Sequence, residues 1–202
     1  MNTKVQAGAA ATPQSFNWRN ALWTGRGLFE TRDLVTIGLF AGAAKAATLV
    51  VALMGGGMNP VTMVLKSALF SALWVVLLVK VPKTGTLTLA NTVGALLAFF
   101  LMGQTMITLP SLMAATLLVE VGIRSLGGYQ GRPWLAALAV GLSELASRVI
   151  HIAYTYLWIR EQPALLAMVA VISLLSYFGI CLGLFGGLRM VRELRHAGLI
   201  QN

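Results

Sequence analysis

The sequence predicts an all-α polytopic membrane protein with six transmembrane helices, and three observations carry that prediction. Six long apolar runs follow one another between residues 34 and 190. Hydrophobic residues make up 57% of the 202-residue chain and charged residues only 10%, whereas soluble domains carry about 25% charged residues. The mean hydropathy is +0.79. Little chain remains outside the runs, so we expect no separate soluble catalytic domain.

The first run, residues 34–54, has 21 residues and is interrupted only by Lys45. At about 1.5 Å per helical residue it crosses a hydrocarbon core of about 30 Å. Asp33 immediately precedes it and is a suitable N-cap. The later runs are residues 61–79, 86–102, 105–123, 134–159 and 164–190. Gly or Pro in every connection favours helix ends between them.

Basic residues predict the orientation, because Lys and Arg in short loops favour the cytoplasmic side. The connections on one side hold Arg19, Arg26, Arg32, Lys80, Lys83, Arg124, Arg132, Arg189, Arg192 and Arg195. Across the membrane, residues 55–60 and the turn at Gly103 have no base, and residues 160–163 have only Arg160. Both termini should therefore be cytoplasmic. The topology and anionic lipid account for the net charge of +9, so we expect no nucleic-acid partner.

The predicted domain division is simple. Residues 1–27 form a cytoplasmic tail, and residues 28–202 form the six-helix transmembrane domain. Aromatic and Arg residues between Phe16 and Arg26 fit a helix lying in the headgroup layer. A loosely held N-terminus fits them equally well.

The residue inventory argues against an enzyme and against a cofactor of the protein's own. Asp33 is the single aspartate, which excludes a multi-Asp metal site. There is no GxxxxGK[ST] phosphate loop and no HExxH zinc motif. The single cysteine, Cys181, has no basic partner nearby in sequence. If ATP drives transport, another chain must bind it.

The fifth run carries the densest polar set at membrane depth, where ionisable residues mark a site or an internal pair. Glu144, Arg148, His151, Thr155 and Trp158 follow at spacings of four, three, four and three, so they share one helical face. Glu144 and Arg148 are predicted to form an ion pair, either as a structural element or as part of a ligand site. Lys45 is too central to reach the surface cheaply, and either Glu144 or Glu120 is a plausible partner.

Small residues form a second pattern. In the first run they are Gly38, Gly42 and Ala46, with Ala43 and Ala47 beside them; in the last run they are Gly179, Gly183 and Gly187. Such stripes let helix backbones approach closely. We expect internal packing for the last run. In the first run the small residues cover more of the helix surface than one interior face needs. We therefore expect that a second protein can dock there.

Several segments resemble the Trep_Strep group of substrate-binding S components of energy-coupling factor (ECF) transporters. They are Phe-Glu-Thr-Arg-Asp-Leu-Val-Thr-Ile-Gly-Leu-Phe at 29–40, the turn Lys-Val-Pro-Lys-Thr-Gly at 80–85, Glu120, Gly-Gly-Leu-Arg-Met-Val at 186–191 and Ala-Gly-Leu-Ile at 197–200. The resemblance extends over residues 28–200. The fifth run departs from the group's pattern at Arg148 and His151.

The resemblance implies an S-component-like bundle in a prokaryotic cytoplasmic (inner) membrane. It also implies two kinds of partner, a transmembrane scaffold (T) subunit and two cytoplasmic ATPases, with the S component tilting in the bilayer to release its cargo. The ligand would lie near the external face. Docking to the scaffold corresponds here to Ala43 and Ala47, together with Gly42.

The leading hypothesis is therefore capture of a micronutrient, such as a vitamin, a corrinoid, haem or another metal chelate. The candidate binding residues are Met58, Asn59, Gln104, Met106, Arg148, His151, Tyr154 and Trp158. Arg148 would pair an anionic group and the aromatic rings would stack on a flat ring. His151 or Met58 would ligate a metal carried by the substrate.

Two alternatives remain open at this point. One is a self-sufficient secondary transporter or small channel in which Lys45, Glu120, Glu144 and His151 form a proton relay. The other is an assembly subunit that binds no ligand.

Overall fold

The computed structural model describes residues 29–55, 59–103, 109–129, 132–159 and 163–198. Within these ranges the chain forms six α-helices: α2 (Thr31–Gly55), α3 (Pro60–Lys80), α4 (Thr86–Met102), α5 (Leu109–Ser125), α6 (Pro133–Ile159) and α7 (Pro163–His196). Among the helices described, α2, α3, α6 and α7 are long and apolar enough to cross a membrane. The predicted all-α membrane fold is confirmed.

Helices α4 and α5 are shorter, with 17 residues each. At about 1.5 Å per residue each spans about 25 Å, slightly less than a hydrocarbon core of about 30 Å. The predicted fourth run began at residue 105, but residues 104–108 lie outside the described ranges. Together the two helices lie between the longer α2 and α6, since α4 packs against α2 and α5, and α5 packs against α6.

The helix starts follow from local sequence. Pro60, Pro133 and Pro163 each occupy the first residue of a helix, where a missing N–H has no intrahelical partner to lose. The prediction of Asp33 as an N-cap is wrong, because α2 already begins at Thr31. Asp33 instead lies in the first turn, where its Oδ2 accepts the Glu30 N–H at 3.1 Å and pairs with Lys83 Nζ at 2.6 Å. This pair ties the start of α2 to the α3–α4 turn.

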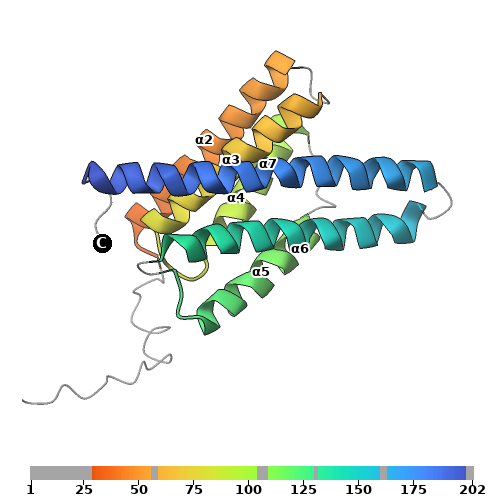
Figure 1. Cartoon of the computed structure of the whole chain (residues 1–202). Coiled ribbons are helices and arrows are strands. Elements are labelled where there is room, and N and C mark those ends of the chain that lie inside the picture. Colours follow the sequence, from red (N-terminus) through yellow and green to blue (C-terminus); the bar gives the residue numbers. More distant parts are fainter. Residues whose placement is uncertain (1–28, 56–58, 104–108, 130–131, 160–162, 199–202) are drawn as a thin grey trace, which may run out of the picture.

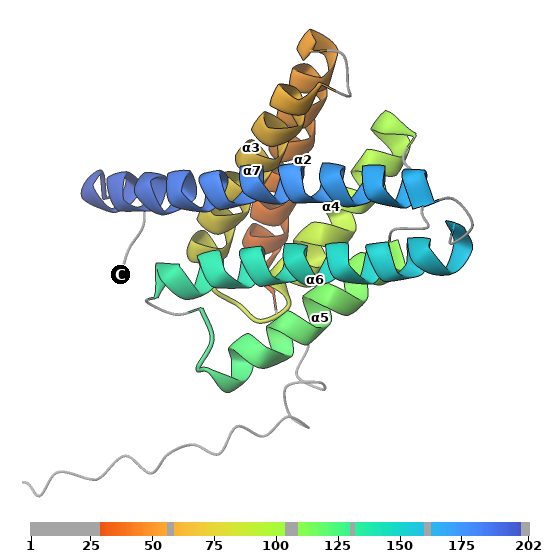
Figure 2. The ribbon, with the colours of Figure 1, turned by 45° about the vertical axis from the view of Figure 1, so that its right-hand side comes forward.

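The helices converge at one end of the molecule. The start of α2, the end of α7 and the α3–α4 and α5–α6 connections gather there, at the left of Figure 1. In the views of both Figure 1 and Figure 2, α2 and α3 cross α7, and α3 packs against α7. The end where the helices converge is the basic end of the chain, which the sequence predicts to be cytoplasmic.

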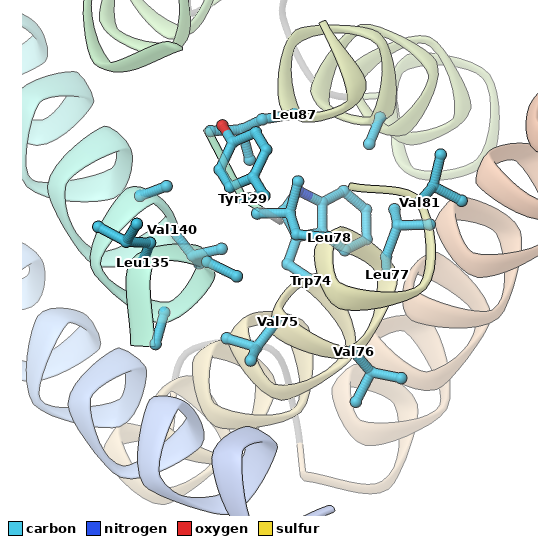
Figure 3. Packing of buried hydrophobic residues seen from close by; sticks show 14 of the residues in the cluster. Trp74, Val75, Val76, Leu77, Leu78, Val81, Leu87, Tyr129, Leu135 and Val140 are labelled. Carbon is cyan, nitrogen blue, oxygen red and sulfur yellow. The ribbon is translucent and has the colours of Figure 1, made fainter. Parts of the chain in front are cut away.

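The hydrophobic core fills this basic end. Trp74, Leu77, Leu78, Leu87 and Leu135 are at most 1% exposed. They come from α3, α4 and α6, and Figure 3 shows them close together with Tyr129 from the α5–α6 connection. Close van der Waals packing of these side chains therefore stabilises the basic end of the bundle.

Glu120 of α5 also belongs to the basic end, where it caps α4. Its Oε1 accepts the backbone N–H groups of Gly85, Leu87 and Thr88 at 3.1, 2.9 and 3.3 Å, and its Oε2 accepts the Thr88 hydroxyl at 2.8 Å. Gly85 has φ +95°, a left-handed conformation that a glycine adopts without strain. The carboxylate thus binds the positive end of the α4 dipole.

Tyr129 is buried beside this cap, with 3% of its surface exposed. Burial raises the pKa of its phenol well above the ordinary value, and the negative charge of Glu120 raises it further. Tyr129 therefore stays neutral at physiological pH.

The small residues of α7 pack against α3, as the sequence predicts. A Cβ built on Gly183 would lie 2.7 Å from Ala68 Cα, and one on Gly179 would lie 2.9 Å from Val64 Cα. Real Cβ atoms essentially never approach so closely. The two backbones therefore meet at a distance that only glycine permits in α7.

The small residues of α2 behave differently. A Cβ built on Gly38 or Gly42 would meet nothing within 4 Å. Ala43 is exposed and Ala47 is half-buried, whereas Ala41 and Ala44 are fully buried on the other side of the helix. This face of α2 is therefore left open by the described part of the chain.

Candidate functional site

A cavity of about 520 Å³ lies away from the packed core. Its lining residues come from five helices, α2, α3, α5, α6 and α7. They are Lys45, Thr48, Ala52, Lys66, Ser67, Phe70, Ser111, Glu144, Ser147, Arg148, His151, Ser173 and Ile180. Most of them lie in the helix halves nearest the α2–α3, α4–α5 and α6–α7 connections. The cavity thus belongs to the end that the sequence predicts to be external.

Glu144 and Arg148 meet on the α6 wall of this cavity, so the predicted ion pair is present. Arg148 Nη2 lies 3.7 Å from Glu144 Oε2, and the two side chains are 23% and 15% exposed. Arg148 Nη1 donates to the Ser173 carbonyl oxygen of α7 at 3.4 Å. Both distances exceed the 2.7–2.9 Å of a strong charge-assisted hydrogen bond. The guanidinium is therefore held in place but weakly bound.

Lys45 projects into the same cavity from α2. Its ammonium lies 5.5 Å from the centre of the Phe70 ring, within reach of a cation–π interaction. Phe70 stacks on Trp74 at 4.3 Å, and the Trp74 indole donates to Asn91 Oδ1 at 2.8 Å. This column of α3 and α4 side chains fixes the ring against which Lys45 rests.

Of the two acids weighed as partners for Lys45, Glu144 is the one in the cavity. The charges of Lys45 and Glu144 interact, and Glu144 interacts with Arg148 as well. Glu120 lies at the basic end, where the α4 cap occupies both its oxygens. Of the two partners predicted as possible for Lys45, Glu120 is therefore wrong. Lys45, Glu144 and Arg148 share the cavity, and Glu144 interacts with both cations.

Hydroxyl groups complete the lining. Ser67, Ser111, Ser147 and Ser173 come from four different helices, and Lys66 lies among them. Sequence analysis did not place Lys66 or these serines at a binding site. Serine is common in membrane helices and has no fixed spacing across helices, so the sequence held no signal for them.

Two of the eight candidate ligand residues, Arg148 and His151, line the cavity. Asn59 instead lies at the N-cap of α3, where its side-chain oxygen accepts the Val61 N–H at 3.1 Å. Tyr154 is 43% exposed and is not part of the lining. Outside the described residues lie Met58, Gln104 and Met106, and the Trp158 side chain.

Metal ligands do not gather anywhere in the described residues. Within those ranges no group of three or more His, Cys, Asp or Glu side chains comes together. Glu144 and His151 are the two described lining residues able to ligate a metal, and they lie seven residues apart on α6. A metal reaching this cavity would therefore need most of its ligands from another molecule.

Comparison with known proteins identifies one family. The model of a family described as hypothetical bacterial integral membrane protein (Trep_Strep) matches residues 31–162, which include α2 to α6 and more than half of the chain. Searches of curated proteins and of solved structures found no match.

Proposed function

This chain belongs to the Trep_Strep family of bacterial integral membrane proteins, and from that premise we propose that it is the substrate-binding S component of an ECF transporter. It captures a micronutrient from outside the cell without chemical conversion. A scaffold subunit and two ATPases then drive the import. The protein itself holds no cofactor and is not an enzyme.

The observation that carries this proposal is the polar cavity between α2, α3, α5, α6 and α7. Its volume of about 520 Å³ lies in the range of about 300–1,000 Å³ typical of small-molecule sites. Ionisable side chains at membrane depth are costly, and Lys45, Glu144 and Arg148 are retained there together. A binding role explains why three charged side chains line one cavity.

The packed basic end supports capture rather than free passage. Below the cavity, Trp74, Leu77 and Leu78 are at most 1% exposed. A substrate that enters from the external end therefore meets a filled core. Release on the other side requires the protein to move as a whole or to open, which fits a subunit that depends on partners and ATP.

The same arrangement argues against the proton-relay alternative. Lys45, Glu144 and His151 share the cavity, but Glu120 lies at the opposite end of α5 from Ser111, which lines the cavity. There both its carboxylate oxygens are engaged, because Glu120 accepts four hydrogen bonds as the α4 cap. The relay therefore lacks its fourth member.

Within the proposed function, the open face of α2 is the docking surface for the scaffold subunit. Gly42, Ala43 and Ala47 lie on this face, and the small side chains at these positions allow a partner helix to approach closely. His151 faces the cavity and would supply an axial ligand if the cargo carries a metal.

Co-purification and transport assays test the proposal. The tagged protein, purified from its native membrane, should bring down a scaffold subunit and two ATPases, and uptake into liposomes should require all of them and ATP. Transport by the purified chain alone, driven by a proton gradient, would contradict the proposal. A chain that purifies with one protein partner and takes up nothing would indicate the assembly-subunit alternative.

Arg148→Ala probes the cavity within that assay. Removing one side of a desolvated charge pair should lower substrate affinity by about 2 to 5 kcal/mol. Since the variant also leaves Glu144 without Arg148, the double variant Glu144→Gln, Arg148→Ala is the control for folding. Full affinity in the double variant would mean that the pair is structural and that the substrate binds elsewhere.

A further inference from the structure

The charges in the cavity point to the chemical class of the substrate. We propose that the cavity selects a small organic anion, and that Arg148 and Lys45 together bind its carboxylate or phosphate group. This inference rests on the proposed function for the direction of transport, but the binding site itself can be tested without any partner protein.

The first argument is the balance of charge. Lys45 and Arg148 both interact electrostatically with Glu144, so two cations share one carboxylate. One positive charge among these three residues is left over. An unbalanced charge is costly at membrane depth. A bound anion would balance it, whereas a neutral or cationic substrate would not.

The second argument is the incomplete bonding of Arg148. A guanidinium has five N–H donors. Within the described residues Arg148 makes one hydrogen bond of 3.4 Å and one ion pair of 3.7 Å, while its buried Nε has no hydrogen-bond partner. A buried donor without an acceptor costs stability. The two oxygens of a carboxylate or phosphate match the fork of donors on one side of the guanidinium.

The third argument is the set of contacts that Lys45 makes. In the described part of the chain its ammonium contacts the face of Phe70 and makes no hydrogen bond or close ion pair. Its side chain also lies near the α4 backbone, since a Cβ built on Gly94 would lie 3.4 Å from Lys45 Cε. The ammonium is thus positioned by packing, with its donors available to a ligand. Positioning before binding reduces the entropic cost of recognition.

The size of the cavity narrows the class further. A volume of about 520 Å³ lies in the lower half of the usual range for ligand sites. Among the described lining residues, Phe70 is the single phenylalanine, tyrosine or tryptophan. The cavity therefore suits a vitamin-sized anion with one ring or a short chain, in which the hydroxyl groups of Ser111, Ser147 and Ser173 meet its polar edges.

Lysine labelling with two matched aldehydes tests the proposal on the full-length protein in detergent micelles. Pyridoxal phosphate carries an anionic group, and pyridoxal is the same molecule without it. Each aldehyde condenses with a lysine amine with loss of water, and borohydride then reduces the imine to a stable adduct that peptide mass spectrometry locates. Lys80, exposed at the opposite end of α3, reports the intrinsic reactivity of each reagent.

The measured quantity is the rate of labelling by pyridoxal phosphate divided by the rate of labelling by pyridoxal. We expect this ratio to be about tenfold higher at Lys45 than at Lys80, because one added charge contact is worth about a factor of ten. Arg148→Gln should abolish this preference, whereas Arg148→Lys, which keeps the charge, should retain most of it. The comparison of the two reagents on the unaltered protein needs no variant, so a variant that fails to fold does not weaken the test.

Equal labelling of Lys45 by the two reagents, no labelling of Lys45, or an unchanged preference in folded Arg148→Gln would each overturn the anion site. The result is separable from the transporter proposal. If the labelling preference is found but no ATPase co-purifies, the anion site stands and the ECF assignment fails. If ATPases co-purify without the preference, the substrate is not an anion.

Discussion

The contact between α3 and α7 gives the sharpest test of the structure, through the substitution Gly183→Ala. The new Cβ would lie 2.7 Å from Ala68 Cα and even closer to Ala68 O and Ser71 Oγ. Backbone atoms cannot rotate away, so α3 and α7 must separate. The single hydroxyl proton of Ser71 has three carbonyl oxygens within reach, those of Ser67 and Ala68 in its own helix and that of Ile180 in α7 at 3.1 Å. Separation would remove only the acceptor on α7.

The expected cost can be worked out with Gly186→Ala as the matched control. A Cβ on Gly186, three residues further along α7, would meet nothing within 4 Å. Both substitutions gain the same helix propensity, up to about 1 kcal/mol, which cancels in the comparison. Overpacking costs about 1–3 kcal/mol, and Ser71 keeps an acceptor within α3. Gly183→Ala should therefore be about 1 to 3 kcal/mol less stable than Gly186→Ala.

The measurement is the free energy of unfolding of each purified variant, from SDS titration in detergent micelles followed by circular dichroism. Gly186→Ala should unfold at or above the wild-type SDS concentration, and Gly183→Ala clearly below it. If the two variants are equally stable, α7 does not approach the backbone of α3 at this position and the packing described above is wrong.

Three further predictions concern other parts of the molecule. Glu120→Ala should lower the free energy of unfolding by about 2 to 3 kcal/mol, because buried N–H groups lose a charged acceptor, and Glu120→Gln should lose less; an equal loss in the same titration would contradict the cap. Ala43→Leu with Ala47→Leu should leave the monomer folded and weaken co-purification of the scaffold, whereas Ala44→Leu, at a fully buried position, should unfold it. Normal assembly of the first variant would move the docking face elsewhere. A cysteine at Gln201, in a Cys-free background, should react with a membrane-impermeant thiol reagent only after the cells are opened; labelling of intact cells would invert the topology.

The sequence by itself determined the membrane fold and the limits of most helices. Hydropathy and length act locally along the chain, because each helix satisfies its own backbone hydrogen bonds in lipid. Proline at the start of α3, α6 and α7 marked three boundaries within a residue or two. The pairing of Glu144 with Arg148 was also predictable, since a spacing of four residues places both on one helix face.

Tertiary structure alone decided which polar residues share a site. Lys45 on α2 and Glu144 on α6 are about a hundred residues apart in sequence, and only the packing of five helices brings them to one cavity. The same packing places Glu120 at the start of α4, although the sequence made Glu120 as plausible a partner for Lys45 as Glu144. It also separated two similar small-residue stripes, burying that of α7 against α3 and leaving that of α2 open. Periodicity defines the faces of a helix, but which neighbour each face meets depends on the packing of all six helices together.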